Sequence, residues 1–113
     1  MIGNKYGARK ISTPDGEFDS KHEYQRWCEL VLLQKAKLIS NLHRQVKYVL
    51  IPTQRKAGKV LERECCYYAD FTYFDDKGRF HVEDAKSEAT RTKEYIIKRK
   101  LMLKEHGLRI EEI

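Results

Sequence analysis

Acidic residues and one lysine interrupt a stretch that otherwise reads as the two strands of a β-hairpin. The stretch from Tyr68 to Lys86 is YADFTYFDDKGRFHVEDAK, in which runs rich in Phe, Tyr and Val flank a turn that contains glycine. Asp70 lies in the first run, and Asp84 lies in the second. Carboxylates inside a half-buried strand are costly unless a partner compensates their charge. A divalent cation would be such a partner, because hard cations prefer carboxylate oxygens as ligands.

The register of this hairpin decides which carboxylates share a face of the sheet. A three-residue loop that ends at Gly78 would set Asp70 opposite Asp84. A two- or four-residue loop would instead set Asp70 opposite Glu83, which is therefore an alternative ligand. We favour the three-residue loop, because Gly78 stands where that turn requires a positive φ. Lys86 then lies on the same face as Asp84, since side chains alternate along a strand.

The composition indicates one basic globular domain over residues 1–113. Hydrophobic residues make up 41% and charged residues 35% of the chain, and no apolar run is long enough to span a membrane. The N-terminus lacks the apolar core of a secretory signal, so we expect a cytoplasmic, intracellular protein. Lys and Arg number 23 against 17 Asp and Glu, and the resulting formal charge of +6 favours a polyanionic partner such as DNA.

Positive charge gathers in two segments outside the acidic strands. Residues 1–10 read as a flexible basic arm. The second segment runs from Arg91 to Lys104, where Glu94 is the one acidic residue. Its candidate phosphate contacts are Lys93, Lys98, Arg99 and Lys100. Such a segment binds phosphate in some proteins and is an ordinary solvated face in others, and the pattern alone leaves both interpretations open.

A helix before the strands has to bring a further carboxylate to the hairpin. Ser20 and Glu23 have the S-x-x-E spacing of a capping box, which predicts a helix that begins here and ends near Lys37. Its apolar stripe consists of Tyr24, Trp27, Cys28 and Val31, with Leu32 at the edge. Glu23 lies at the border of this stripe, one turn before Trp27. The pattern therefore leaves two roles open for its carboxylate. It could cap the helix, or it could reach the boundary between helix and sheet.

The remaining elements complete the order helix, three strands, helix, strand. We expect a hairpin at 11–18 and a strand at 45–51, which follows a connection at 41–44. A basic loop at 53–59 and a long strand at 60–74 come next. The chain then forms a helix that runs to His106, capped by Ser87 or Thr90, and a strand at 108–113. A strand reached through a helical crossover is parallel to its neighbour. The chain is therefore an α/β (α+β) protein with a mixed sheet flanked by helices. Apolar residues on more than one side of the second helix suggest contact with a partner chain.

This ordered set of residues resembles the PD-(D/E)XK nuclease superfamily. Glu23 on a helix, Asp70 on a strand and the Asp84-Ala85-Lys86 tripeptide on the next strand are similar to its motif, and the order of elements is similar to its αβββαβ core. Ala69 stands where the superfamily has proline. The stretches NKYGARK, FDSKHEYQRW, VEDAK and GLRIEE resemble small phage and prophage endonucleases.

The resemblance implies a restriction-endonuclease-like fold and Mg²⁺- or Mn²⁺-dependent hydrolysis of DNA. The implied metal ligands are Glu23, Asp70, Asp84 and the backbone carbonyl of Ala85, and Lys86 is the implied catalytic lysine. Similar phage enzymes include the endonuclease I type of four-way-junction resolvase, which acts as a homodimer. This resemblance suggests a Holliday-junction resolvase, or a recombination or packaging nuclease. Such a protein would be of phage or prophage origin and active in a bacterial host.

Two other classes of protein fit parts of the pattern. A non-catalytic nucleic-acid-binding module on a nuclease fold would keep the basic segments. A structural protein would use the acids in salt bridges with the surplus lysines. The combination of carboxylates with Lys86 favours the nuclease, because binding alone does not require buried acids.

Overall fold

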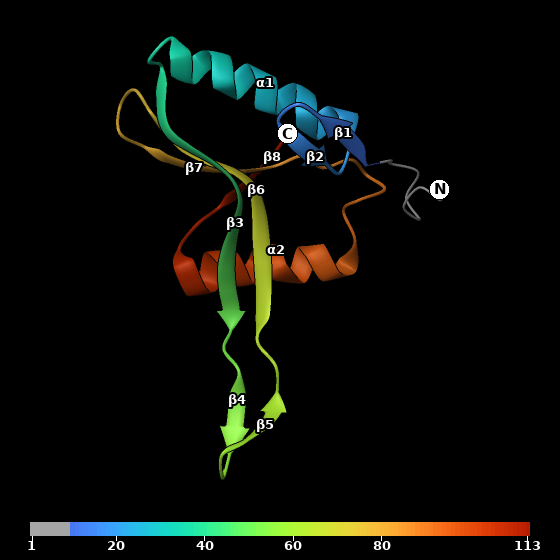
Figure 1. The fold of residues 1–113 in the computed structure, drawn as a ribbon. Coiled ribbons are helices and arrows are strands. Elements are labelled where there is room, and N and C mark those ends of the chain that lie inside the picture. The colour runs from blue at the N-terminus through green and yellow to red at the C-terminus, as the bar shows by residue number, and fades with distance from the viewer. Residues whose placement is uncertain (1–9) are drawn as a thin grey trace.

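The computed structural model describes residues 10–113 and has a central four-stranded sheet in the order β3-β6-β7-β8. These strands are Ile39–Ile51, Cys65–Asp75, Phe80–Asp84 and Ile110–Glu112. Helices α1 (Lys21–Lys35) and α2 (Lys93–His106) lie on opposite sides of the sheet (Figure 1). The expected α+β class is confirmed, including the mixed sheet and the small N-terminal hairpin of β1 (Ile11–Thr13) and β2 (Gly16–Phe18). Apart from residue 10, the basic arm expected over 1–10 lies outside the described residues.

The register expected for the central hairpin is confirmed. Phe71 pairs with Glu83 across β6 and β7, so the same ladder sets Asp70 opposite Asp84. The loop has three residues, and Gly78 adopts a φ of 78°. Strand β8 pairs with β7 in parallel, as the helical crossover requires.

Helix α1 is capped as expected, but its fully buried apolar residue lies outside the predicted stripe. The Ser20 hydroxyl accepts a hydrogen bond from the Glu23 amide at 3.1 Å. Within the helix, Glu23 and Leu30 are the buried residues, whereas the predicted stripe is only half-buried. Of the expected stripe, Trp27 does pack against the core between α1 and the sheet, where it stacks on Phe71. The expectation was wrong in omitting Leu30, which is the apolar residue of α1 that this core buries.

Helix α2 begins later than expected. Its cap is Thr92, whose hydroxyl accepts a hydrogen bond from the Tyr95 amide at 3.2 Å. Ser87 and Thr90 instead bond to each other in a preceding turn, where the Ser87 amide donates to the Thr90 hydroxyl at 2.9 Å. Gly107 ends the helix with a φ of 66°, as predicted.

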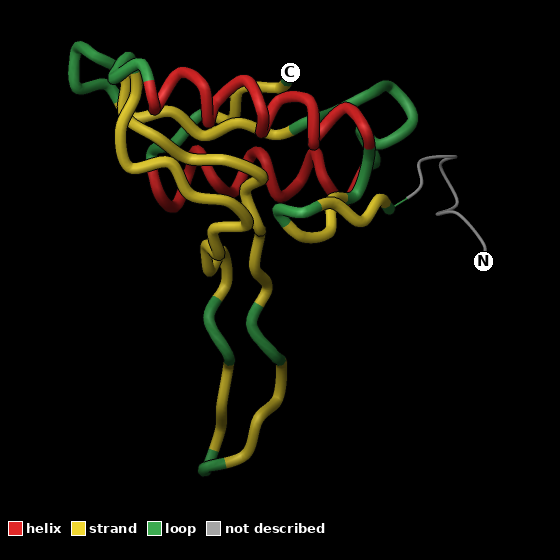
Figure 2. The backbone as a smooth tube through the Cα atoms, turned by 45° about the horizontal axis from the view of Figure 1, so that its top comes forward, coloured by secondary structure: helices red, strands yellow, loops and turns green. Residues whose placement is uncertain are grey.

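The long strands differ most from the sequence-based expectation. Residues 41–44, expected as a connection, belong to β3, which carries a bulge between Ser40 and His43. The expected loop at 53–59 and the start of the long strand are a separate hairpin of β4 (Gln54–Lys56) and β5 (Lys59–Glu62). We call this hairpin, residues 54–62, the β-ribbon. It projects away from the sheet and helices (Figures 1 and 2).

Within residues 10–113, neither α1 nor α2 has the length and hydrophobicity that a membrane-crossing helix needs.

Candidate functional site

Side chains from α1, β6 and β7 meet around one cavity of about 170 Å³. Its lining residues are Asp19, Ser20, Glu23, Asp70, Asp84, Ala85, Lys86 and Thr90. This set includes every residue that the sequence predicted as a metal ligand or as the catalytic lysine. The carboxylates are almost fully enclosed, with exposed fractions of 2% for Glu23, 8% for Asp70 and 3% for Asp84.

Hydrogen bonds hold the two carboxylates of the hairpin. Asp70 accepts a hydrogen bond through Oδ2 from the Ala85 amide at 2.8 Å. Asp84 accepts one through Oδ2 from the Tyr67 hydroxyl at 2.5 Å. The other oxygen of each carboxylate, Oδ1, is available for contacts with the remaining groups of the cavity.

The alternation of side chains along β6 is interrupted at Asp70. Ala69 and Phe71 would share one face of a regular strand, yet Ala69 packs in the core under α2 and Phe71 packs in the core under α1. Gln45, which the ladder places opposite Asp70, has a φ of 51°. A positive φ is costly for a residue other than glycine, and such strain is concentrated at functional sites.

Glu23 fulfils both of its predicted roles. Its Oε1 accepts a hydrogen bond from the Asp19 amide at 2.8 Å, which closes the cap one residue earlier than in the usual capping box. Its Oε2 lies 3.1 Å from the Gln45 amide nitrogen and 4.0 Å from the Arg44 guanidinium. The N-terminal hairpin helps to place Arg44, which stacks on the Phe18 ring at 3.6 Å.

Gln45 is the site residue that the sequence analysis missed. Its amide nitrogen donates hydrogen bonds to Glu23 Oε2 at 3.1 Å and to Asp70 Oδ1 at 3.2 Å, so it bridges the two carboxylates. The sequence showed only a polar residue at the start of an apolar strand. Its position opposite Asp70 follows from the register of β3 with β6, which no sequence motif indicated.

Lys86 is held between an acid and an aromatic ring. Its ammonium lies 3.5 Å from Asp84 Oδ1 and 4.3 Å from the centre of the Tyr95 ring on α2. The backbone on either side of Ala85 is fixed by Ile113. The Ile113 amide donates to the Asp84 carbonyl at 3.0 Å, and the Lys86 amide donates to the Ile113 carbonyl at 3.1 Å.

Burial and mutual repulsion raise the pKa values of two carboxylates in the cavity, Glu23 and Asp70. Burial, followed by the charge of Asp70, raises the pKa of Glu23 to about 7. Burial, followed by the charge of Asp84, raises the pKa of Asp70 well above its ordinary value. Arg44 and Lys86 therefore do not fully compensate the charges of Glu23 and Asp70, which is the electrostatic condition that favours a bound divalent cation.

The carboxylates of the cavity are of the chemical type that hard cations bind, but they are not spaced to hold an ion directly. Among residues 10–113, no three Asp, Glu, His or Cys side chains lie close enough together to hold a metal ion directly. The Gln45 amide lies between Glu23 and Asp70, where its N–H groups partly compensate the charge of both carboxylates. Carboxylate oxygens are suited to Mg²⁺ or Mn²⁺.

The bridging amide leads to a prediction for metal affinity. Replacing Gln45 by alanine is expected to tighten Mn²⁺ binding about tenfold, because the ion no longer displaces two hydrogen bonds to carboxylates. Calorimetric titration of Mn²⁺ checks this, with Gln25→Ala, an exposed change on α1, as the control. Unchanged or weaker Mn²⁺ binding in Gln45→Ala would show that the amide does not compete with the ion.

The raised pKa values also predict how stability depends on pH. The folded protein holds protons on Glu23 and Asp70 that the unfolded chain releases near pH 4, so metal-free stability should fall as pH rises from about 4.5 to 8. The fall should be of the order of a few kcal/mol in the free energy of unfolding. Urea unfolding in EDTA across this range measures it.

The control for this prediction is Asp70→Asn, which removes one of the two titrating acids. Its stability should fall less steeply over the same pH range, and saturating Mg²⁺ should flatten the wild-type curve. The variant is needed because the raised pKa of His81, caused by its hydrogen bond with Asp75, has the same sign of effect. Parallel curves for the wild type and the variant would contradict the assignment.

Glu83, the alternative ligand, lies outside the cavity. Its carboxylate points to the opposite face of β7 and accepts two hydrogen bonds from the Arg26 guanidinium at 2.8 and 2.7 Å. The Tyr73 hydroxyl donates a third. The alternative register is therefore excluded, and Glu83 belongs to a buried ion pair between β7 and α1.

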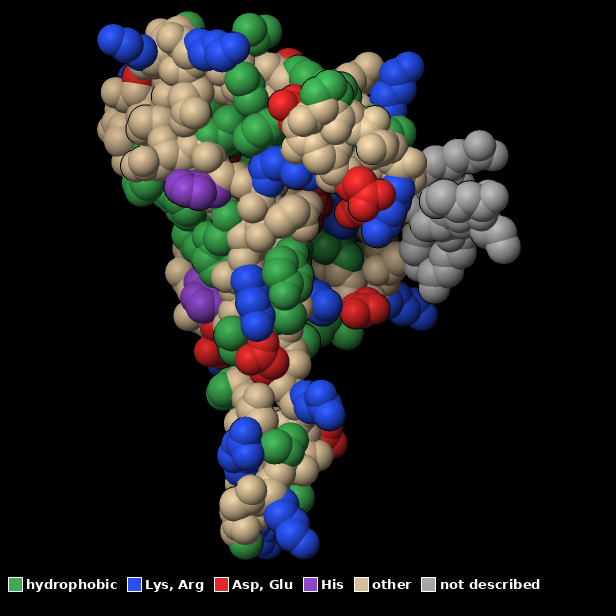
Figure 3. Space-filling view, in the orientation of Figure 1, with side chains coloured by type: hydrophobic (Ala, Val, Ile, Leu, Met, Phe, Trp, Pro, Cys, Tyr) green, Lys and Arg blue, Asp and Glu red, His purple; other side chains and the backbone are tan. Residues whose placement is uncertain are grey.

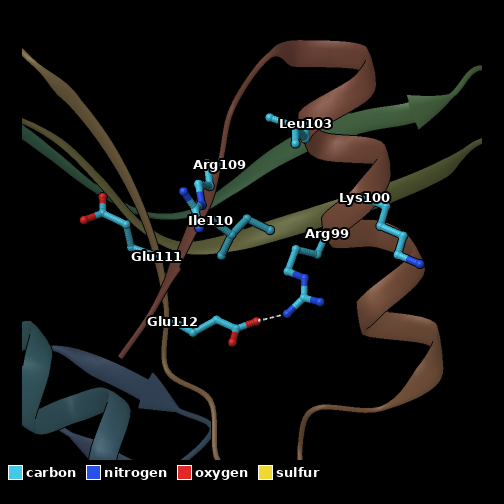
Figure 4. A pocket seen from close by; sticks show the side chains of 7 residues that line it. All are labelled: Arg99, Lys100, Leu103, Arg109, Ile110, Glu111 and Glu112. Carbon is cyan, nitrogen blue, oxygen red and sulfur yellow. Dashed lines mark hydrogen bonds and ion pairs between the residues drawn. The ribbon is translucent and has the colours of Figure 1, made fainter.

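The basic residues predicted on α2 do not form one surface. Lys98 lines a groove of about 570 Å³ that contains Asp70, Asp84 and the half-exposed Tyr68. Arg99 and Lys100 line a different cavity, of about 710 Å³, between α2 and β8 (Figure 4). Arg99 is paired there with Glu112 at 2.8 Å. Lys93 is exposed in the first turn of α2. Of the four, Lys98 is the one that lies beside the carboxylates.

The chain belongs to a family of proteins whose activity is not established. The family described as "Protein of unknown function (DUF1064)" matches residues 3–110. No significant match to this chain was found among curated proteins or among solved structures.

Proposed function

We propose that this protein is a metal-dependent DNA endonuclease that hydrolyses phosphodiester bonds with Mg²⁺ or Mn²⁺. The observation that supports the proposal is the meeting of Glu23, Asp70, Asp84 and Lys86, from three separate elements, around one cavity. Burying three acids beside a lysine is costly for a purely structural protein. In a nuclease the same acids are useful, because they hold the divalent cation that brings positive charge to the phosphate.

Each residue has a distinct task in this proposal. Glu23, Asp70, Asp84 and the Ala85 carbonyl would hold the cation. When bound, the ion would neutralise charge on the scissile phosphate and lower the pKa of a water molecule. Lys86, kept in place by Asp84 and Tyr95, would donate a hydrogen bond to the attacking water or to a phosphate oxygen.

The groove beside the cavity suits a nucleic-acid strand. Its lining includes Asp70, Asp84, Tyr68 and Lys98, together with Glu94. Tyr68, 51% exposed, offers a face on which a base can stack. Lys98 lies 3.3 Å from Glu94, a surface pair that phosphate can replace at little cost.

The finer proposal concerns branched DNA in a phage or prophage context. Resolution of a Holliday junction needs two symmetric cuts and hence two sites, so we propose a homodimer that acts in the cytoplasm of a bacterial host. Ile97 and Leu103 of α2 are candidates for the contact, because they are 59% and 56% exposed. Sedimentation of the protein with and without a junction tests this step.

The experiment that tests the function is cleavage of supercoiled plasmid and of a synthetic four-way junction, each with Mg²⁺, Mn²⁺ or EDTA. Cutting that requires the metal supports the endonuclease, and a preference for the junction supports the resolvase. DNA binding without cutting in any metal would favour the non-catalytic binding module instead. Neither binding nor cutting would favour a structural role for the acids.

A further inference from the structure

The β-ribbon is an exposed two-stranded element with no core of its own. Strands β4 and β5 pair with each other and join no other sheet, and every residue from Gln54 to Glu62 is exposed. Its turn is formed by Ala57 and Gly58, with φ values of 51° and 80°, the pair of positive angles that a two-residue hairpin turn requires. An isolated hairpin is only marginally stable in water, so a surface partner would stabilise it.

Charge at the tip of the β-ribbon indicates the class of that partner. The segment Gln54 to Lys59 contains Arg55, Lys56 and Lys59 and no acidic residue. Blue side chains gather at the tip, away from the body of the protein (Figure 3). Within residues 10–113 none of the three forms an ion pair, whereas Lys47, at the base of the ribbon, is paired with Glu64 at 2.6 Å. The tip cations are therefore available to an external polyanion.

We infer that the β-ribbon is a docking element for duplex DNA, and this inference rests on the proposed action on DNA. The major groove of B-form DNA admits a two-stranded β-ribbon, and cations at its tip are suited to phosphates along the groove. Val60 and Leu61, which are 45% and 61% exposed, add apolar surface of the kind that contacts thymine methyl groups.

The length of the β-ribbon sets where these contacts fall. The chain runs in an extended course from Gly58 at the tip to Asp70 in the cavity, which at about 3.3 Å per residue spans up to about 40 Å. One turn of the double helix rises about 34 Å. With the ribbon aligned along the duplex, the tip would meet phosphates up to about one helical turn from the phosphate at the carboxylates.

The test measures binding in EDTA, where no cleavage occurs, as a function of salt and duplex length. The triple variant is Arg55→Gln, Lys56→Gln and Lys59→Gln. The matched control is Lys35→Gln, Lys37→Gln and Lys77→Gln, which removes the same charge from exposed positions at the end of α1 and in the turn between β6 and β7. These two segments lie far from the β-ribbon (Figure 1). For the ribbon variant, the slope of log K against log salt should fall by about 2 to 3, at about 0.9 for each phosphate that the protein no longer neutralises.

Duplex length provides the second readout. Wild-type affinity should rise between duplexes of about 8 and about 30 base pairs, since about 8 base pairs are shorter than one helical turn and only the longer duplex reaches both the cavity and the tip. The ribbon variant should lose this dependence, and the control should keep it. Equal slopes for both variants, or a shift from dimer to monomer in the ribbon variant without a change in slope, would overturn the inference.

Failure of this inference is distinguishable from failure of the proposed function. A protein that cleaves DNA with an unchanged slope in the ribbon variant overturns the docking role alone. A protein that binds DNA through the β-ribbon but never cleaves it overturns the nuclease alone.

Discussion

Replacing Asp84 by asparagine is expected to reduce metal-dependent DNA cleavage by about 10² to 10³-fold. The change removes a buried negative charge that would hold the cation and that orients Lys86 at 3.5 Å. The Tyr67 hydroxyl can still donate to the remaining carbonyl oxygen, so the fold should be retained. DNA affinity in EDTA should be unchanged or slightly tighter, because a negative charge near the phosphate is removed.

Cleavage rate and DNA binding of the same preparation measure this effect. The matched control is Asp76→Asn, the same chemical change at an exposed residue of the turn between β6 and β7. It should leave both quantities unaltered. Full cleavage by purified Asp84→Asn would falsify the assignment of the cavity as the active site.

The largest effect on stability is expected from the ion pair on the opposite face of β7. Glu83→Ala should lower the free energy of unfolding by about 2 to 4 kcal/mol, because it leaves the partly buried Arg26 guanidinium with only the exposed Glu29 as a partner, at 3.2 Å. The Tyr73 hydroxyl also loses its acceptor. Urea unfolding at neutral pH measures the change in stability.

A second change separates charge from packing at this ion pair. The double variant Arg26→Met with Glu83→Leu should recover most of the stability, since an apolar pair of similar volume avoids the buried charge. Folded Glu83→Ala protein should cleave DNA at the wild-type rate. A cleavage defect out of proportion to the unfolded fraction would place Glu83 in the catalytic machinery and contradict the register.

The features of the site that could be predicted are those determined by residues close together in the sequence. Gly78 fixed the loop, the loop fixed the register, and the register set Asp70 opposite Asp84. Ser20 likewise marked the start of α1 and so the position of Glu23. These features depend on a few neighbouring residues, and their stereochemistry can be read without knowledge of the rest of the fold.

Gln45 and the β-ribbon depended on features that the sequence does not mark. Gln45 reaches the carboxylates because β3 carries a bulge after Ser40 and pairs with β6 in one particular register. The turn of the ribbon has Ala57 at a positive φ, where Asn, Asp or Gly would have signalled a hairpin. At Gln45 the long-range pairing of β3 with β6, and in the ribbon the pairing of two adjacent strands, overrides the preference of the residue, which is why sequence patterns missed both.

The attachment of the β-ribbon has a consequence for how such proteins diversify. The ribbon continues the same two strands that carry Gln45 and Asp70, yet the pairing is broken between β3 and β4 and again between β5 and β6. Residues inserted or deleted in pairs beyond these breaks would alter the reach of the ribbon without shifting Gln45 relative to Asp70. The fold therefore lets the length of the β-ribbon change without altering the carboxylate cavity.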